Sequence, residues 1–140
     1  MITLTTKVAF KAPAAEVWKG LTDPELVKQY FFGTIQKSDW KEGSPITWTG
    51  EWDGNSYEDK GVIKEIVHGK YVRYSYWSSM AGSEDRPENY ADVSYELDAQ
   101  CDTTTILTIT QTNFKDEASK EHSEKSWQMM FDGLKKLIEK

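Results

Sequence analysis

The sequence predicts an α+β fold in which a long C-terminal helix lies across a curved antiparallel sheet. Between residues 34 and 114, apolar and polar residues alternate and turn signals interrupt them, the pattern of consecutive hairpins. From Asp116 to Lys140, apolar residues instead recur at intervals of three and four, as in a helix with one buried face. The length of 140 residues suits one domain, which we place at residues 1–140.

The N-terminal segment predicts a strand followed by two short helices. Ile2–Phe10 alternates apolar and polar residues, so it reads as a strand with one buried face. Pro13 suits the first position of a helix, and the apolar residues after it share one face: Val17, Trp18 and Leu21. Asp23 and Pro24 repeat this start signal as N-cap and first helical residue. We expect the second helix to reach about Phe32-Gly33.

Further strands follow in hairpin order. Their expected bounds are Thr34–Trp40, Ile46–Trp52, Tyr57–Val67, Tyr71–Ser78, Ala91–Ala99 and Thr104–Phe114. Sequential hairpins imply antiparallel pairing, so the sheet should have about six or seven strands. The longest expected loop is Ser78–Asn89. Gly133 in the last helix costs about 1 kcal/mol relative to alanine, which indicates close packing against another backbone.

Composition and charge exclude several kinds of partner and site. The net charge of −6 and the scattered basic residues argue against nucleic acid or an anionic membrane as a main partner. Cys101 is the single cysteine, expected as a semi-buried thiol, and it cannot form an internal disulfide. No export signal or membrane-spanning apolar run is present. We therefore expect a cytoplasmic protein without membrane insertion.

Aromatic residues make up 13% of the chain, and strand parity turns many of them toward the long helix. The predicted inward faces are Ile46, Trp48 and Trp52; Val72, Tyr74 and Tyr76; Val93, Tyr95 and Leu97; Leu107, Ile109 and Gln111. Large, stiff rings on a concave sheet can hold it away from its covering helix and leave a cavity. The alternative is a filled core in which these polar groups form a small internal network. Both interpretations remain open from the residues alone.

Three strings resemble one known family. The opening Ala12–Leu26, followed by Phe31-Phe32-Gly33, is similar to the start of the heat-shock protein 90 ATPase activator homologue family. Gly61–Ile66 with Tyr71–Tyr76 resembles its central hairpin, and Trp127 with Leu134–Leu137 its final helix. The resemblance implies the helix-grip fold of the START-like (SRPBCC) superfamily. Relatives bind lipids, plant hormones or flavonoids, cyclise aromatic polyketides or act as co-chaperones, so fold does not settle function.

Signals for catalysis are sparse. The sequence has no nucleophile-elbow or phosphate-loop motif, and its two histidines, His68 and His122, lack metal-site spacing. The adjacent acids Glu58 and Asp59 should point to opposite faces of their strand, so we do not expect them to act as a catalytic pair. We therefore expect no enzyme activity, no metal and no cofactor.

The leading hypothesis is a non-catalytic binding domain that holds a small apolar or aromatic molecule between the sheet and the C-terminal helix. The residues expected to bind this ligand are Trp48, Tyr74, Tyr76, Tyr95, Gln111, Trp127 and Phe131. One alternative is a co-chaperone-like module that stimulates a heat-shock ATPase in a stress response. Another is a polyketide-cyclase-like enzyme. We expect a monomer or weak dimer.

Overall fold

The computed structural model describes residues 2–31, 33–52, 54–78, 84–114 and 116–139, apart from three side chains, those of Trp52, Asn55 and Pro87. The predicted role of Phe32 at the end of the second helix lies outside the described residues. The same holds for the inward face predicted for the Trp52 side chain and for part of the predicted loop Ser78–Asn89.

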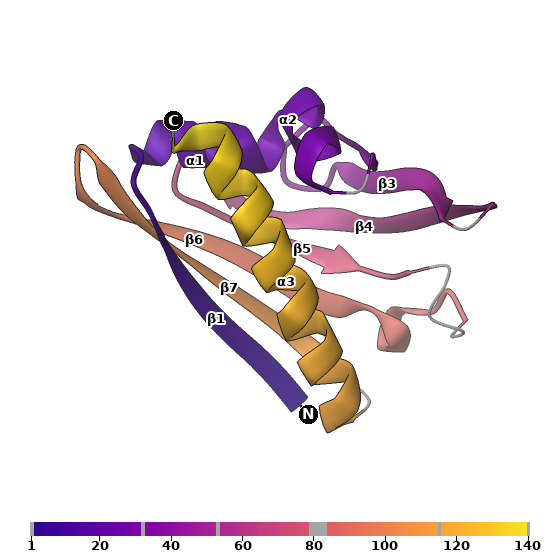
Figure 1. Ribbon diagram of the computed structural model, residues 1–140. Helices are drawn as coiled ribbons and strands as arrows, with labels where there is room; N and C mark the ends of the chain where they lie inside the picture. The colour runs from indigo at the N-terminus through magenta and orange to yellow at the C-terminus, as the bar shows by residue number, and fades with distance from the viewer. Residues whose placement is uncertain (1, 32, 53, 79–83, 115, 140) are drawn as a thin grey trace.

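The architecture is a seven-stranded antiparallel sheet that curves around one long helix (Figure 1). The elements in chain order are β1 (Ile2–Phe10), α1 (Ala14–Thr22), α2 (Pro24–Tyr30), β2 (Ile35–Ser38), β3 (Pro45–Trp52), β4 (Asn55–Val67), β5 (Tyr71–Tyr76), the 3₁₀ turn η1 (Pro87–Asn89), β6 (Ala91–Cys101), β7 (Thr104–Phe114) and α3 (Glu117–Ile138). The strand order is β1-β7-β6-β5-β4-β3-β2. This arrangement confirms the predicted fold class, including the two short helices after the first strand.

The strand bounds depart from the prediction mainly at β2, β4, β5 and β6, and β4 starts at Asn55 instead of Tyr57. β2 covers only Ile35–Ser38 instead of Thr34–Trp40. Trp40 ends it because its φ of 55° is left-handed and does not continue a strand. β5 ends at Tyr76, although Trp77 still forms an isolated bridge with Lys60.

β6 continues past its predicted end at Ala99 to Cys101, at the tip of a hairpin. There Cys101 is exposed. The expectation of a semi-buried thiol is therefore wrong, because this end of the hairpin projects beyond the part of the sheet that the helices cover (Figure 1).

Asp23 forms the tight corner between α1 and α2. Its backbone N–H donates to the Lys19 carbonyl and closes α1, while its carboxylate accepts from the Glu25 N–H at 2.9 Å and caps α2. Pro24 occupies the first position of α2 as predicted. The Tyr30 hydroxyl then donates to the Gly20 carbonyl at 2.8 Å and ties the two helices together.

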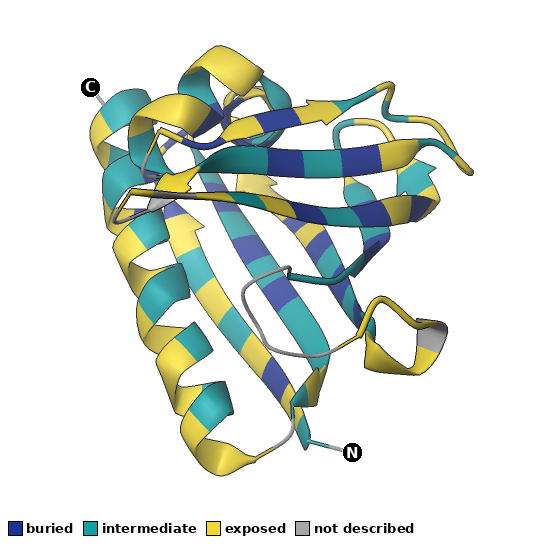
Figure 2. Ribbon diagram, turned by 90° about the vertical axis from the view of Figure 1, so that its right-hand side faces the viewer, coloured by how far each residue is buried: buried dark blue, intermediate teal, exposed yellow. Residues whose placement is uncertain are grey.

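α3 is buried only near its C-terminal end. Asp116 caps the helix by accepting from the Ser119 N–H at 2.8 Å, and Lys135 and Lys136 complement the dipole in the last turn. Phe131 and Leu134 are its buried residues, whereas the first half of the helix alternates between exposed and half-buried positions (Figure 2). No described helix combines the length and apolar character that crossing a bilayer requires.

The core lies between the inner face of the sheet and the C-terminal half of α3. The inward parity is confirmed: Ile46, Trp48, Val72, Tyr74, Val93, Tyr95, Leu97, Leu107 and Ile109 are all buried. Tyr76 and Gln111 lie on the same faces and are half-buried. On the outer face, Arg73 pairs with Glu65 at 2.7 Å, as its opposite parity predicts.

Gly133 brings α3 and α2 into close contact. A Cβ atom at Gly133 would lie 2.9 Å from Cβ and 3.6 Å from Cα of Tyr30. Neither atom can be moved by rotating a side chain, so a larger residue must displace α2. The predicted approach of another backbone at this position is confirmed.

We predict that Gly133→Ala destabilises the protein by about 1 to 2 kcal/mol, because the clash with Tyr30 outweighs the better helix propensity of alanine. Urea denaturation measures the effect. The matched control is Asp132→Ala at the adjacent exposed position, which should change stability by less than about 0.5 kcal/mol. A Gly133→Ala protein at least as stable as the parent would show that α2 does not rest on this contact.

Candidate functional site

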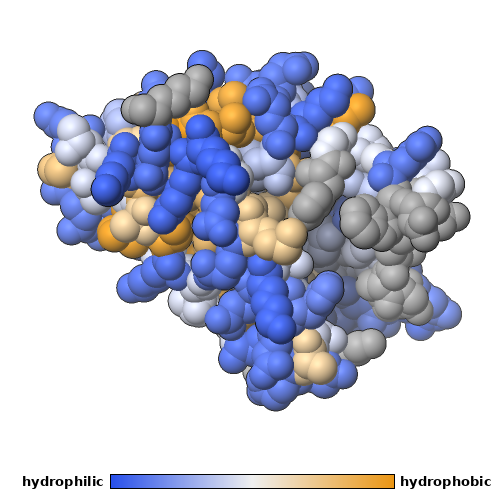
Figure 3. Space-filling model, viewed as in Figure 1, coloured by the Kyte–Doolittle hydropathy of each residue, from blue (hydrophilic) through white to orange (hydrophobic). Residues whose placement is uncertain are grey.

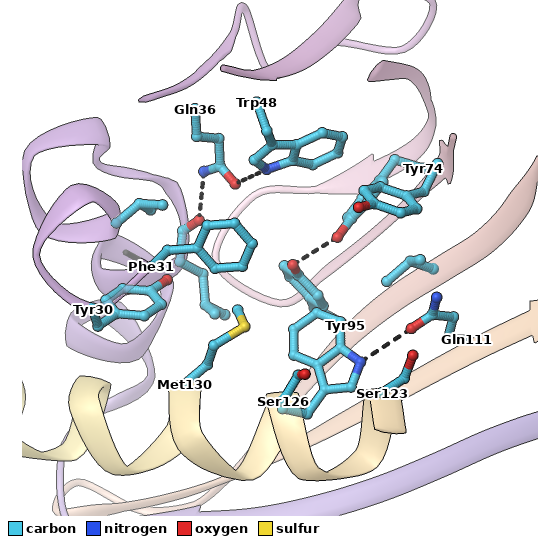
Figure 4. A pocket seen from close by; sticks show the side chains of 15 residues that line it. Tyr30, Phe31, Gln36, Trp48, Tyr74, Tyr95, Gln111, Ser123, Ser126 and Met130 are labelled. Atoms are coloured by element: carbon cyan, nitrogen blue, oxygen red, sulfur yellow. Dashed lines mark hydrogen bonds between the residues drawn. The ribbon is translucent and has the colours of Figure 1, made fainter. Parts of the chain in front are cut away.

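A cavity of about 260 Å³ lies between the sheet and the stretch of α3 from 123 to 130, with α2 on one side (Figure 4). Its lining residues are Leu21, Val27, Tyr30, Phe31, Gln36, Trp48, Tyr74, Tyr76, Val93, Tyr95, Gln111, Ser123, Ser126, Trp127 and Met130. The outer surface of α3 that covers this region is mostly hydrophilic, with Met129 as an exposed apolar residue on it (Figure 3). The apolar side of the site therefore faces inward.

Neighbouring strands supply the floor of the cavity. Tyr74 on β5 pairs in register with Val93 on β6, and Val93 pairs with Gln111 on β7. Tyr95 follows Val93 by two residues and points to the same face. Strand alternation thus gathers these side chains on one patch, as the sequence predicts.

The helices supply the cover. Ser123, Ser126, Trp127 and Met130 are spaced by three and four residues and so share one face of α3. From the sequence, Trp127 is predicted as a ligand contact and Met130 as a residue of the same helix face, whereas the two serines were missed. The missed signal is that two small serines occupy the inward stripe of an otherwise apolar helical pattern, where they leave room between helix and sheet.

Five rings form a continuous aromatic wall, which we define as Trp48, Tyr74, Tyr76, Tyr95 and Trp127. Trp48 lies 5.3 Å from Tyr74 and 5.2 Å from Tyr76, measured between ring centroids. Tyr74 meets Tyr95 at 5.5 Å, and Tyr95 meets Trp127 at 6.0 Å, both edge to face. These distances are typical of favourable aromatic pairs, so the rings hold one another in place.

Gln36 fixes one end of the aromatic wall. Its Nε2 donates to the Leu21 carbonyl at 2.9 Å, and its Oε1 accepts from Trp48 Nε1 at 2.8 Å. Gln36 is buried and pairs with Trp48 across β2 and β3. It therefore satisfies a carbonyl in the last turn of α1 and orients the indole at once. Sequence reasoning missed Gln36, although its place on a strand next to Trp48 was a usable signal.

The other polar groups of the wall are also paired. The hydroxyls of Tyr74 and Tyr95 form a 2.7 Å hydrogen bond. Trp127 Nε1 donates to Gln111 Oε1 at 3.1 Å (Figure 4). Both features expected as alternatives, a cavity and an internal polar network, are present together.

Asp59 lies behind the wall as a buried carboxylate. It is 7% exposed and accepts from the Tyr76 hydroxyl at 2.7 Å. Glu58 next to it is exposed, so the two acids do point to opposite faces. Asp59 is buried because its face of β4 is the inner one, opposite Trp48 in register.

Burial keeps the tyrosines of the wall protonated. It raises the pKa of Tyr74 well above its ordinary value and that of Tyr95 to about 12. Burial first, and then the negative charge of Asp59, raises the pKa of Tyr76 as well. At neutral pH these phenols are uncharged hydrogen-bonding groups rather than bases.

The residues predicted to bind the ligand are brought together, with one exception. Trp48, Tyr74, Tyr76, Tyr95, Gln111 and Trp127 all line the cavity. Phe131 does not: it is buried, stacks behind Trp127 at 6.2 Å and meets Phe10 edge-on at 6.4 Å. One helical turn beyond Trp127, α3 has already closed onto the core. The structure therefore places Phe131 as support for the wall.

The histidines lie away from this lining. His68 is exposed and contacts the edge of Trp18, with ring centroids 6.2 Å apart. His122 is exposed in the first turns of α3. Among the described residues, no group of three or more His, Cys, Asp or Glu side chains could hold a metal ion.

Comparison with known proteins gives the family. Residues 11–139 match the family model of the Activator of Hsp90 ATPase homolog 1-like protein. This chain belongs to that family. The resemblance read from the opening string, the central hairpin and the final helix is thereby confirmed. No curated protein sequence matches the chain significantly.

Solved structures show the same fold in other family members and relatives. ChR145 from Cytophaga hutchinsonii has 42% identity and a TM-score of 0.84, over 98% of this chain and 93% of its own. The Aha1 dimer from Colwellia psychrerythraea has 16% identity and a TM-score of 0.75, over 99% and 96%. PFC0360w, an HSP90 activator from Plasmodium falciparum, has 16% identity and a TM-score of 0.71, over 91% and 88%. At 16% identity the similarity concerns the fold alone.

We predict that Gln36→Leu destabilises this family member by about 2 to 4 kcal/mol, because the buried Leu21 carbonyl and the Trp48 indole N–H both lose their partner. Chemical denaturation followed by tryptophan fluorescence measures the loss. The control Gln29→Leu removes an exposed amide that bonds only within α2, and should change stability by less than about 0.5 kcal/mol. Equal effects of the two substitutions would contradict the role assigned to Gln36.

The tyrosine pair predicts a loss of stability at alkaline pH. The pKa of Tyr95 rises from 10.0 to about 12 on folding, so the native state holds this proton more firmly than the unfolded chain. The resulting stabilisation is complete below pH 10 and is lost as the pH rises toward about 12. In Tyr95→Phe, the decline of unfolding free energy over this range should be shallower by up to about 1.4 kcal/mol per pH unit. Urea denaturation at several alkaline pH values tests this, and identical slopes in both proteins would contradict it.

Proposed function

We propose that this chain is a non-catalytic binding protein that holds a small apolar or aromatic molecule between the sheet and α3. One observation carries the proposal: the cavity of about 260 Å³ is walled by aromatic rings that hydrogen bonds hold in place. A largely preformed apolar space with a few fixed polar groups is typical of small-molecule sites. The proposed contact residues are Trp48, Tyr74, Tyr76, Tyr95, Gln111 and Trp127.

The lining favours an uncharged ligand. No Asp, Glu, Lys, Arg or His is among the described lining residues. An ion that entered this space would lose its hydration and find no opposite charge to replace it, a cost that a neutral molecule does not incur. We therefore propose a neutral ligand.

The same lining favours binding over catalysis. Tyrosines are protonated at neutral pH, and burial raises the pKa values of Tyr74 and Tyr95 further, so they are poor general bases. Asp59 is engaged behind the wall with the Tyr76 hydroxyl. Turnover of a poly-ketone substrate that is lost in both Tyr74→Phe and Gln111→Ala would contradict this view and support a cyclase-like enzyme instead.

Native mass spectrometry of the purified protein tests the proposal. We expect an added mass from a co-purified small molecule, or from an uncharged aromatic probe supplied in excess. Ser126→Trp should abolish the added mass, because an indole at this lining position occupies the cavity. Lys125→Trp, at the adjacent exposed position of α3, is the matched control and should retain it.

A protein that carries no small molecule and takes up no uncharged aromatic probe, although it is folded, would not be a binding protein of this kind. Retention of the probe by the Ser126→Trp protein would show that binding occurs elsewhere.

Membership of the Hsp90-activator family supports a second candidate, an interaction module that stimulates a heat-shock ATPase. PFC0360w, whose fold this chain shares, is an HSP90 activator. The module would use its surface, so the Ser126→Trp substitution should leave stimulation intact. ATPase assays with a heat-shock protein 90 partner decide the question, and absence of stimulation removes this candidate. For either function the proposed setting is the cytoplasm.

A further inference from the structure

One hydroxyl proton of the aromatic wall has no acceptor in the part of the chain that the structure describes. Resting on the proposed binding function, this unpaired donor indicates the chemical class of the ligand. Tyr74 and Tyr95 are 3% and 5% exposed, and their hydroxyls bond to each other at 2.7 Å. Two hydroxyls carry two protons, and a single hydrogen bond between them uses one. Whichever tyrosine donates, the accepting hydroxyl keeps a proton of its own.

The surrounding groups do not take up this second proton. Gln36 and Gln111 accept from Trp48 and Trp127, and neither amide oxygen forms a hydrogen bond with Tyr74 or Tyr95. The Tyr30 hydroxyl is directed to the Gly20 carbonyl. Among the described residues, neither hydroxyl of the pair makes another hydrogen bond. A buried hydroxyl proton without an acceptor is unfavourable, so the wall is poised for an acceptor from outside.

The pair is well placed to meet a ligand. Figure 4 shows its hydroxyls in the middle of the lining, between Trp48 and the side chains that α3 contributes. The amide of Gln111 lies nearby on β7, diagonal to Tyr95 across the β6–β7 pairing. Only its oxygen is committed, to Trp127, so its nitrogen is a second donor on the same side of the cavity.

We propose that the ligand of this cavity carries a neutral acceptor oxygen, such as a ketone or amide carbonyl, that accepts the spare proton of the Tyr74–Tyr95 pair. This class of ligand complements the cavity: its apolar or aromatic body packs against the rings, and its uncharged oxygen accepts the spare hydroxyl proton. A carboxylate also accepts, but it brings a full charge into a lining without a described cation. The raised pKa values of both tyrosines keep the donor protonated across the physiological range.

Three probes of equal ring size test the proposal: acetylnaphthalene, which has a carbonyl; ethylnaphthalene, which lacks it; and naphthoate, which is charged. Their affinities are compared in the parent protein and in the double variant Tyr74→Phe/Tyr95→Phe, by titration calorimetry or tryptophan quenching. We expect the parent to bind the ketone at least as tightly as the hydrocarbon, and naphthoate far more weakly. In the double variant the affinity for the ketone relative to the hydrocarbon should fall about three- to tenfold.

Tyr71→Phe is the matched control, since it removes a phenol from the outward parity of the same strand, β5. It should leave the ketone-to-hydrocarbon ratio as in the parent. If the double variant does not fold, the parent alone still decides: clearly tighter binding of the hydrocarbon than of the ketone would overturn the proposal. So would a ratio that the double variant leaves unchanged, or tight binding of naphthoate.

These outcomes distinguish the carbonyl assignment from the binding function on which it rests. Equal uptake of ketone and hydrocarbon with no effect of the double variant would leave the binding function standing and remove the carbonyl assignment. Failure of all three probes to bind would remove the binding function itself.

Discussion

The close approach of α3 to the two short helices is the constraint on which the rest of the structure depends. At its C-terminal end α3 has no room to spare: Gly133 meets the Cβ of Tyr30, and a Cβ at Gly20 would lie 2.5 Å from Leu134 Cδ1. Phe131 and Leu134 are buried there, and the Glu139 carboxylate accepts from the Lys11 N–H at 3.1 Å. The other end of the helix has no comparable anchor among the described residues. α3 therefore rests on the core at one end and spans the aromatic wall at the other.

Because α3 spans the aromatic wall, the indole and phenol groups of the wall must find hydrogen-bond partners inside the protein. Rings large enough to support a helix bring indole and phenol groups into a buried space, where each polar group needs a partner. Gln36 serves Trp48, Gln111 serves Trp127, and Asp59 serves Tyr76. The partners are drawn from three strands, β2, β4 and β7, so the bonds that satisfy the rings also tie the wall to both halves of the sheet.

Much of this fold could be predicted from the spacing of apolar residues, because that spacing is a property of each helix or strand by itself. β7 has the predicted bounds Thr104–Phe114, and α3 starts one residue after Asp116, where the helical spacing begins in the sequence. The inward faces were likewise predictable, since a buried face repeats every second residue. These features require no knowledge of what lies opposite.

The parts that sequence reasoning missed depend on pairs of elements. Asp59 on β4 is buried, and its carboxylate accepts from Tyr76 on the adjacent strand, a contact that the pattern of neither strand alone predicts. Gln36 gains its role from two partners, on α1 and β3, and Phe131 loses contact with the cavity because α3 descends toward Phe10 just before it. The two serines also depend on such a pair, since their small size matters only where α3 faces the sheet. Larger side chains at Ser123 and Ser126 would recover the dispersion contacts that an unfilled space forgoes, so their small size leaves room for the cavity.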